Sequence, residues 1–455
     1  MKKAWLLKWT PFLLLALVTV IGLTVSPGHL VTQKGMVAGD IAWVLVASTL
    51  VFLMTPGLSF FYGGMVNRRN VISTMLQSFI ATGVVSVLWV VVGFSLAFGT
   101  SFHGLIGSPM THPFFKGMLD GAPWSLAPTI PLLLFALFQM KFAVITPALV
   151  VGAVAERIQF KAYLLFMVLF SLFIYCPIAH WTWNPEGILF KFGVLDFAGG
   201  TVVHISAGCA ALAGALVLKR RKSHLTHTQS APANIPFVLL GTGLLWFGWF
   251  GFNAGSALAA NDLAALAFAT TNTATAVAGL TWIFFDVMRG RKPSVIGFCV
   301  GAVVGLVAIT PAAGFVGIPQ SMCIGFVAAI VSNLAVHWKS RSTLDDTLDV
   351  FPCHGIGGMV GMLMTGIFAT TAINSAGSNG WFYGNFTLFV HQALGMLLVV
   401  AYSFTMGLAI FKLVNWIYPL RVSEEEEEMG LDLSQHDERY QPVGSAAILH
   451  EMEMM

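Results

Sequence analysis

Residues 195–222 read LDFAGGTVVHISAGCAALAGALVLKRRK, and this stretch decides the fold. An aspartate stands near its start, a long apolar run with a single histidine follows, and four consecutive basic residues close it. Such a run is long enough for a helix to cross the hydrocarbon core of a bilayer, which needs about 20 residues. A basic cluster directly after the run is typical of the cytoplasmic end of a membrane span. The stretch therefore predicts a transmembrane helix that carries an ionisable group inside the membrane.

Similar apolar runs recur along the whole chain of 455 residues, of which 57% are hydrophobic and only 9% charged. A soluble globular protein has roughly 25% charged residues, so that class is excluded. The apolar and aromatic content excludes disorder, and 23 Lys and Arg against 20 Asp and Glu leave no basic excess for nucleic acid. The runs lack the short alternating segments of a transmembrane barrel. We therefore predict an all-α polytopic membrane protein.

Eleven membrane spans are predicted, and the placement of charge supports the count. Thirteen Lys and Arg residues lie in every second loop, whereas the alternate loops hold only Lys116 and Lys191. Basic loops face the cytoplasm, so the mature N-terminus is expected outside and the C-terminus inside. The predicted spans lie near residues 40–62, 71–98, 127–151, 162–182, 197–218, 236–257, 263–285, 294–311, 315–336, 350–372 and 388–416.

Both ends of the chain differ from this membrane domain of residues 38–420. Residues 1–28 carry three lysines, an apolar run and Ser26-Pro27-Gly28, which fits either a signal peptide or an extra N-terminal helix. Residues 421–455 hold ten of the 20 acids. We predict an acidic cytoplasmic tail that docks on the basic inner loops.

The five cysteines lie in apolar runs without a Cys-x-x-Cys pair, so we expect core residues and no metal site.

Two short sequence matches, each five spans apart, indicate an internal repeat. Because five is odd, the two halves must cross the membrane in opposite directions, as in the inverted repeats of many transporters. The halves are predicted at about 40–220 and 236–373, with the eleventh helix at 388–416. The matches are Ile145-Thr146-Pro147-Ala148 with Ile309-Thr310-Pro311-Ala312, and Leu195-Asp196-Phe197 before His204 with Leu348-Asp349-Val350-Phe351 before His354.

His204 and His354 are the main candidates for chemistry, since they occupy equivalent spans of the two halves. A histidine inside the membrane either bonds a neighbouring helix or marks a conduction path. A neutral imidazole offers one donor and one acceptor nitrogen, which suits a small neutral solute or a relayed proton. Asp196 has two interpretations: an acceptor for the start of its helix, or a carboxylate that holds a cation outside.

Aromatic residues cluster near the same spans. Phe138, Gln139 and Phe142 lie in the third span, and Trp181 and Trp183 lie at the end of the fourth. Tryptophans at span ends usually form an interfacial belt. Aromatic faces also attract cations by about 0.5–2 kcal/mol each. Two rings and a hydroxyl group would therefore select a cation that donates hydrogen bonds.

The chain resembles the ammonium transporter (Amt/Mep/Rh) family, specifically the bacterial-type Amt branch, from about residue 38 to 435. The tail from Arg421-Val422 to Gly430-Leu431-Asp432 also resembles the family. The other matching stretches are Phe61-Tyr62-Gly63-Gly64, Gly152-Ala153-Val154-Ala155-Glu156-Arg157, Asp196-Phe197-Ala198-Gly199-Gly200-Thr201-Val202-Val203-His204, Gly248-Trp249-Phe250-Gly251-Phe252-Asn253-Ala254-Gly255-Ser256, and Asp349-Val350-Phe351 with His354-Gly355.

The resemblance implies a homotrimer in the plasma (inner) membrane with one pore per subunit, no enzymatic activity, no cofactor and no metal. It implies that ammonium is recruited at an outer cage and deprotonated, and that ammonia then passes the paired histidines. The Rh branch typically lacks the cage tryptophan and serine. The implied roles are recruitment for Phe142, Trp183 and Ser256; the pore gate for Phe142 and Phe252; the pore histidines His204 and His354; and support from Asp196, Gln139 and Trp249.

Two departures from the family pattern concern the cage. The interval from Trp183 to Asp196 is one residue longer than in familiar members, which leaves Trp181 as the alternative. Lys141 adjoins Phe142 and points about 100° away from it on a helix, towards a neighbouring helix or the vestibule wall.

Two other functions compete with transport. One is an ammonium sensor that signals through its tail, for which the stretch after Arg421 is too short to hold a kinase or cyclase domain. The other is an Rh-type gas channel, which Trp183 and Ser256 disfavour. No nucleotide-binding motif supports ATP-driven pumping. The resemblance also implies a cytoplasmic PII-type regulatory partner.

Overall fold

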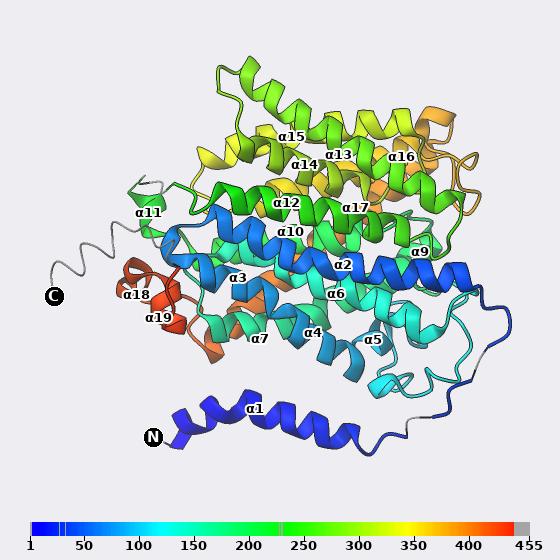
Figure 1. The fold of residues 1–455 in the computed structure, drawn as a ribbon, viewed down its shortest axis with the longest axis horizontal. Coiled ribbons are helices and arrows are strands. Elements are labelled where there is room, and N and C mark those ends of the chain that lie inside the picture. The colour runs from blue at the N-terminus through cyan, green and yellow to red at the C-terminus, as the bar shows by residue number, and fades with distance from the viewer. Residues whose placement is uncertain (1, 27, 32, 227, 229–230, 441–455) are drawn as a thin grey trace.

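A computed structural model describes residues 2–26, 28–31, 33–226, 228 and 231–440, and the end of the predicted tail lies outside these ranges. Helix α1 (Lys2–Gly22) runs along the outside of the other helices (Figure 1), and its last residues line a pocket with Val87 and Val90. The described residues between Gly22 and Ala38 have no regular structure. This helix covers most of the predicted signal peptide or extra helix, between which the structure does not distinguish.

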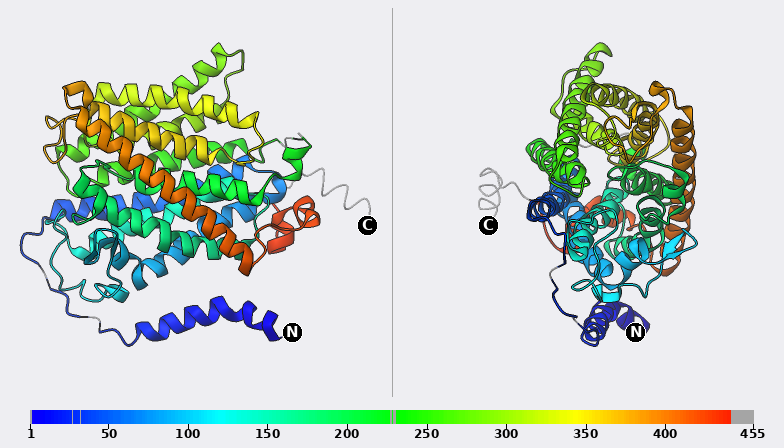
Figure 2. Two further views of the ribbon diagram at one scale, coloured as in Figure 1. Left: turned by 180° about the vertical axis from the view of Figure 1, so that it is seen from behind. Right: turned by 90° about the vertical axis from the view of Figure 1, so that its right-hand side faces the viewer.

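The other long helices form one bundle, with their axes running roughly along a common direction (Figures 1 and 2). The first part of the bundle consists of α2 (Ala38–Met65), η1 (Arg68–Asn70), α3 (Val71–Phe79), α4 (Ala81–Leu88), η2 (Trp89–Gly93), α5 (Phe94–Phe98), α6 (Leu132–Val154), α7 (Phe160–Phe170), η4 (Ser171–Tyr175), α8 (Cys176–Trp183), α9 (Ile188–Phe192), η5 (Gly200–Ile205) and α10 (Ser206–Leu218).

The second part of the bundle ends with one long final helix. It consists of α11 (Lys222–Leu225), α12 (Ile235–Trp249), η6 (Phe250–Ala254), α13 (Asp262–Met288), α14 (Val295–Ile309), α15 (Ile318–Ser340), η7 (Phe351–Ile356), α16 (Gly357–Phe368) and α17 (Phe386–Ile417). The short elements outside the bundle are β1 (Ser101–Phe102), β2 (Ile106–Gly107), η3 (Pro113–Phe115), η8 (Trp381–Tyr383), α18 (Glu424–Met429) and α19 (Leu431–His436).

The described residues contain ten helical stretches that are long and apolar enough to cross a membrane. The predicted span at 294–311 corresponds to α14, an apolar helix of only 15 residues. The other ten predicted spans each coincide with one long stretch, with ends that differ by several residues. The apolar runs therefore predicted the helices correctly, while the count of eleven membrane crossings stays a prediction.

Glycines bring α2 and α12 into close contact. A Cβ atom on Gly241 would lie 2.3 Å from the backbone nitrogen of Phe61, and one on Gly64 would lie 2.6 Å from the carbonyl oxygen of Asn234. Neither position can accept a side chain without separating the two backbones. Small residues at such contacts are how membrane helices approach each other, because apolar burial provides little driving force between helices in lipid.

One prediction about the cysteines is wrong. Cys176, Cys209, Cys299 and Cys353 are buried, but Cys323 is exposed. Cys323 lies on the side of α15 that faces away from the bundle, since Ile324 and its neighbours make the packed face of this helix. An apolar run does not distinguish the two faces of a membrane helix, because the lipid-facing side is as apolar as the core.

A buried ionic network joins three loops at the end of the bundle where α18 and α19 lie, here called the tail end. Arg157 is fully buried and donates to the Asp345 carbonyl oxygen (2.5 Å) and to Thr347 Oγ1 (2.7 Å). Arg221 contacts both Asp345 (2.8 Å) and Glu156 (2.5 Å). Burial opposes ionisation of Asp345, but hydrogen bonds and charge from Arg221 and Arg157 outweigh it and hold the pKa of this carboxyl well below its usual value. A lowered carboxyl pKa stabilises the fold above the unfolded pKa, so the network contributes fully at neutral pH.

The acidic tail docks on the basic loops, as predicted. The backbone N–H of Lys222 donates to Glu427 Oε1 (2.7 Å), and its ammonium group forms an ion pair with Glu428. Arg69 donates to the Glu428 carbonyl oxygen (2.6 Å). The exposed ion pair alone contributes little. The backbone contacts hold α18 and α19 against the loops at the tail end.

Candidate functional site

Asp196 shapes the start of the helix that carries His204. Its carboxylate accepts hydrogen bonds from the backbone N–H groups of Gly199 (2.8 Å), Gly200 (2.6 Å) and Thr201 (2.7 Å), and from Thr201 Oγ1. Gly199 has φ of 122°, which favours glycine. The first turns of the span form the π-helical segment η5, and π-helical turns are frequent at functional sites. Asp196 therefore acts as the helix-start acceptor, one of its two predicted roles.

Asp346 makes contacts before His354 like those that Asp196 makes before His204, so the predicted pairing of Asp196 with Asp349 is wrong. Asp346 accepts from the backbone N–H groups of Val350 (3.1 Å) and Phe351 (2.7 Å), at the start of the π-helical segment η7. It precedes His354 by eight residues, the interval between Asp196 and His204.

Asp349 instead forms an ion pair with Lys339 (2.7 Å). Burial raises the pKa of Asp346 to about 6, although Lys339 opposes this shift. The sequence comparison selected Asp349 because Leu348-Asp349 is the same dipeptide as Leu195-Asp196. A search for the eight-residue interval before the histidine would have found Asp346.

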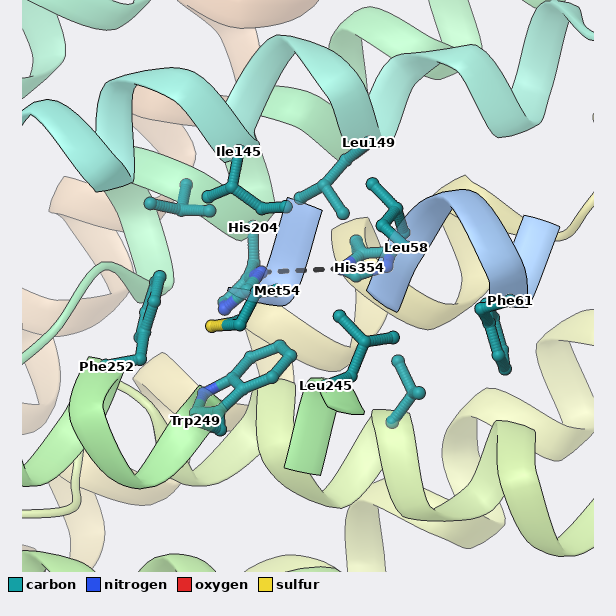
Figure 3. A pocket seen from close by; sticks show the side chains of 12 residues that line it. Met54, Leu58, Phe61, Ile145, Leu149, His204, Leu245, Trp249, Phe252 and His354 are labelled. Carbon is teal, nitrogen blue, oxygen red and sulfur yellow. Dashed lines mark hydrogen bonds between the residues drawn. The ribbon is translucent and has the colours of Figure 1, made fainter. Parts of the chain in front are cut away.

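His204 and His354 meet in the centre of the bundle, side chain to side chain (Figure 3). Their Nδ1 atoms lie 3.4 Å apart, and their exposed fractions are 1% and 4%. One Nδ1 must donate to the other, so the neutral pair holds one shared proton between the rings. The two Nε2 atoms then differ, since one ring keeps a donor and the other an acceptor. His204 Nε2 has no partner among the described residues.

The pair borders a very small cavity with apolar walls. Trp249 lies flat against His204, with ring centroids 5.2 Å apart and planes inclined by 20°. The indole N–H of Trp249 donates to Thr310 Oγ1 (2.9 Å), which fixes the ring. The cavity volume is about 10 Å³, close to the roughly 10–15 Å³ that holds one water. The arrangement therefore admits a molecule the size of water or ammonia. The cavity is lined by Met54, Leu58, Phe61, Ile145, Leu149, Val203, His204, Leu245, Trp249, Phe252, Val303 and His354.

Aromatic rings pack together on the side of His204 that faces away from the tail end. Phe142 and Phe252 overlap with ring centroids 4.3 Å apart and planes inclined by 36°. Trp183 contacts the other side of Phe142 at 5.8 Å, with its plane inclined by 82°. Ser256 lies one turn after Phe252 and donates to its carbonyl oxygen (2.8 Å). The structure thus brings three of the predicted cage and gate residues together and places the fourth beside them.

The extra residue between Trp183 and Asp196 does not displace Trp183. Asn184 Oδ1 accepts from the Glu186 N–H (2.9 Å), which closes a turn outside the cage. The indole N–H of Trp183 donates to the Asp196 carbonyl oxygen (3.0 Å). Trp181 points elsewhere: it donates to the Leu105 carbonyl oxygen (2.7 Å). Of the two tryptophans, Trp183 is the one beside Phe142.

Lys141 lies against helix α2. Its ammonium nitrogen stands 5.4 Å from the ring centre of Phe52 on α2. Phe52 is 43% exposed, so this is the outer surface of the subunit. The side chain therefore faces a neighbouring helix, one of its two predicted positions. Gln139 is buried on the same helix, and its Oε1 has no partner among the described residues.

Comparison with known proteins agrees with these features. The sequence profile of the Ammonium Transporter Family matches residues 42–440. An ammonium transporter of Bacillus subtilis is 45% identical over 405 residues, which cover 89% of this chain and 98% of that protein. The ammonium transporter Amt1 of Archaeoglobus fulgidus is 43% identical over 400 residues, covering 88% and 98%.

Solved structures show the same fold. The crystal structure of Saccharomyces cerevisiae Mep2 superposes with a TM-score of 0.83 at 36% identity, covering 90% of this chain and 93% of that one. A sensor Amt protein superposes with a TM-score of 0.79 at 30% identity, covering 88% and 98%. Sequence and structure together establish that this chain belongs to the ammonium transporter family, whose members are membrane transporters.

Proposed function

We propose that this chain transports ammonium across the plasma membrane by binding the cation outside and passing neutral ammonia through the bundle. Ammonium binds among Phe142, Trp183 and Ser256, where ring faces attract a cation. There it gives a proton to the external water, and ammonia passes between Phe142 and Phe252 to the His204–His354 pair. The main support is the cavity of about 10 Å³ at a neutral histidine pair, since such a site offers hydrogen bonds to ammonia but no fixed charge to a bare ion.

The proposed topology has eleven spans, with the tail end in the cytoplasm. Two observations support an inverted repeat. Asp196 and Asp346 accept from the starts of η5 and η7 in the same way. Thr146 and Thr310 each donate to the carbonyl oxygen four residues earlier (2.6 and 2.7 Å). We further propose a homotrimer, which the mass of the purified protein in detergent, corrected for bound detergent, would measure.

Ammonium uptake by proteoliposomes tests the function. An inward ammonium gradient should produce uptake that depends on the protein, and an equal potassium gradient should produce none. The current that accompanies uptake measures whether the released proton follows the ammonia. Ammonium binding without any uptake would contradict transport and favour the sensing role that the sensor Amt likeness raises.

Trp183→Ala should weaken ammonium recruitment. Loss of a ring contact worth about 0.5–2 kcal/mol raises the half-saturating ammonium concentration by about twofold to thirtyfold. Uptake at saturating ammonium should fall less, because the histidine path is intact. The measurement is the concentration dependence of uptake, with Trp181→Ala as the control. If Trp181→Ala shifts this dependence and Trp183→Ala does not, the cage assignment is wrong.

A PII-type protein is the proposed cytoplasmic partner, docking on the loops and tail that meet at Lys222 and Glu427. The cognate PII protein should bind the full-length transporter in a pull-down, and ADP or 2-oxoglutarate should change the amount bound. A PII protein that fails to bind under every nucleotide condition would refute this partner.

A further inference from the structure

The long final helix α17 carries a buried glutamine, Gln392, to which the proposed pathway gives no role. This helix runs obliquely across the bundle (Figure 2) and lies outside the two predicted halves of the repeat. The exposed fraction of Gln392 is 0%. Buried polar side chains are nearly always hydrogen-bonded, because an unpaired one costs free energy. The partners of Gln392 therefore indicate what it does.

Both ends of the Gln392 amide bond the backbone of one residue, Leu195. Gln392 Oε1 accepts from the Leu195 N–H (2.8 Å), and Gln392 Nε2 donates to the Leu195 carbonyl oxygen (2.7 Å). These two bonds use the acceptor and one donor of the side chain, as an amide allows. Two bonds to the same residue fix where its backbone lies and also how it is rotated.

A glycine on α17 brings the helix close to the same segment. Gly395 lies almost one turn after Gln392, and a Cβ atom there would lie 2.6 Å from Val194 Cγ2. A side chain at this position would therefore push the segment away from α17. The close approach keeps the Gln392 amide within hydrogen-bonding distance of the backbone that follows Val194.

The next peptide groups of the segment reach the recruitment cage. The Asp196 carbonyl oxygen accepts the indole N–H of Trp183 (3.0 Å), and the Trp183 ring contacts Phe142. The N–H of Phe197, which belongs to the same peptide group as this carbonyl, donates to the Pro311 carbonyl oxygen (3.1 Å). The peptide group that bonds Trp183 is thus held from two directions.

Three successive peptide groups from residue 194 to residue 197 are therefore held by hydrogen bonds. Gln392 holds the first two, and the third bonds Trp183. Peptide groups are planar and joined by two soft torsions per residue. Freeing the first two groups therefore lets the third rotate, and the ring that it holds rotates or shifts with it. A ring attracts a cation only when its face lies within about 6 Å of the charge.

We propose that Gln392 is a positioning residue for ammonium recruitment, which acts on the cage through Trp183. It holds the backbone before Asp196, whose carbonyl oxygen then keeps the Trp183 ring beside Phe142. This inference rests on the recruitment cage of the proposed function. It makes the outer site depend on α17, a helix that contributes no residue to the cage itself.

A double-mutant cycle tests whether Gln392 acts through Trp183. Ammonium uptake by proteoliposomes is measured over a range of concentrations for wild type, Gln392→Met, Trp183→Ala and the double variant. Methionine has nearly the shape of glutamine but no amide group. Gln392→Met should raise the half-saturating ammonium concentration by at least about twofold, and by no more than Trp183→Ala does. Maximal uptake should change less, since the histidine path is intact.

In the Trp183→Ala background, Gln392→Met should produce no further shift, because the effects of residues in one network are not additive. Gln77→Met is the matched control. Gln77 is 1% exposed and lies on α3, where its Nε2 donates to Ser73 Oγ (3.4 Å). This variant should keep the wild-type half-saturating concentration. Thermal unfolding in detergent is recorded for every variant, so that loss of folded protein is measured separately.

Gly395→Ala is a second variant that leaves the Gln392 amide in place. Its methyl group pushes Val194 away from α17, so it should shift the half-saturating concentration in the same direction, and only when Trp183 is present. This variant decides the matter if Gln392→Met does not fold.

A wild-type half-saturating concentration in folded Gln392→Met would overturn the inference. Equal shifts with and without Trp183 would also overturn it, because Gln392 would then support the fold in general. Failure of the proposed function is distinguishable from both outcomes, since wild type itself would then take up no ammonium.

Discussion

His204→Asp or His354→Glu is expected to let potassium pass, whereas the wild-type protein excludes it. In the wild-type structure an ion at this depth meets a neutral pair and a cavity of about 10 Å³ without fixed charge. An unpaired charge in the membrane interior costs at least about 2.5–3.5 kcal/mol, which slows passage by roughly 70- to 400-fold. A carboxylate in the same place attracts water and cations, so it removes much of this barrier.

The measurement is potassium current in proteoliposomes, or growth of a host that lacks potassium uptake. At least one of the two variants should support current or growth, and the wild type neither. His391→Asp is the matched control, because it introduces the same acid on α17, where the ring of His391 lies against Phe192 (4.5 Å) rather than in the pore. Potassium conduction by wild type would refute deprotonation. If both variants fold, move ammonium and still exclude potassium, the histidines have only a structural role.

Asp196→Ala is expected to abolish uptake and to destabilise the protein strongly. The substitution leaves the buried N–H groups of Gly199, Gly200 and Thr201 and the Thr201 hydroxyl without their acceptor. Each orphaned buried donor costs about 1–3 kcal/mol, and the total approaches the 5–15 kcal/mol stability of a typical domain. Asp196→Asn keeps one acceptor oxygen and should retain part of both stability and uptake.

Thermal unfolding in detergent and ammonium uptake are measured on the same samples. Asp262→Ala is the control, since Asp262 is exposed in the first turn of α13 and its loss should cost below about 1 kcal/mol. Asp196→Ala with wild-type stability and uptake would mean that η5 does not depend on this carboxylate.

The sequence alone determined the fold class and predicted the histidine pair that meets in the bundle. Long apolar runs can only be buried in a membrane or a core, so they predicted the helices directly. Burying a histidine inside an apolar run costs free energy, so such residues are usually functional. This singled out His204 and His354. The acidic tail and the basic loops also predicted their docking, because opposite charges along the chain are visible without coordinates.

The tertiary structure decided what depends on distance and direction. It placed Trp183 rather than Trp181 beside Phe142, because a turn at Asn184 absorbs the extra residue. It showed that Asp346, and not Asp349, is the helix-start acceptor. Hydrogen bonding depends on where a carboxylate points and not on its neighbour in sequence. It also showed that Lys141 lies over the ring of Phe52 and that Cys323 is exposed. In lipid both faces of a helix are apolar, so only packing between helices decides which one lies inside.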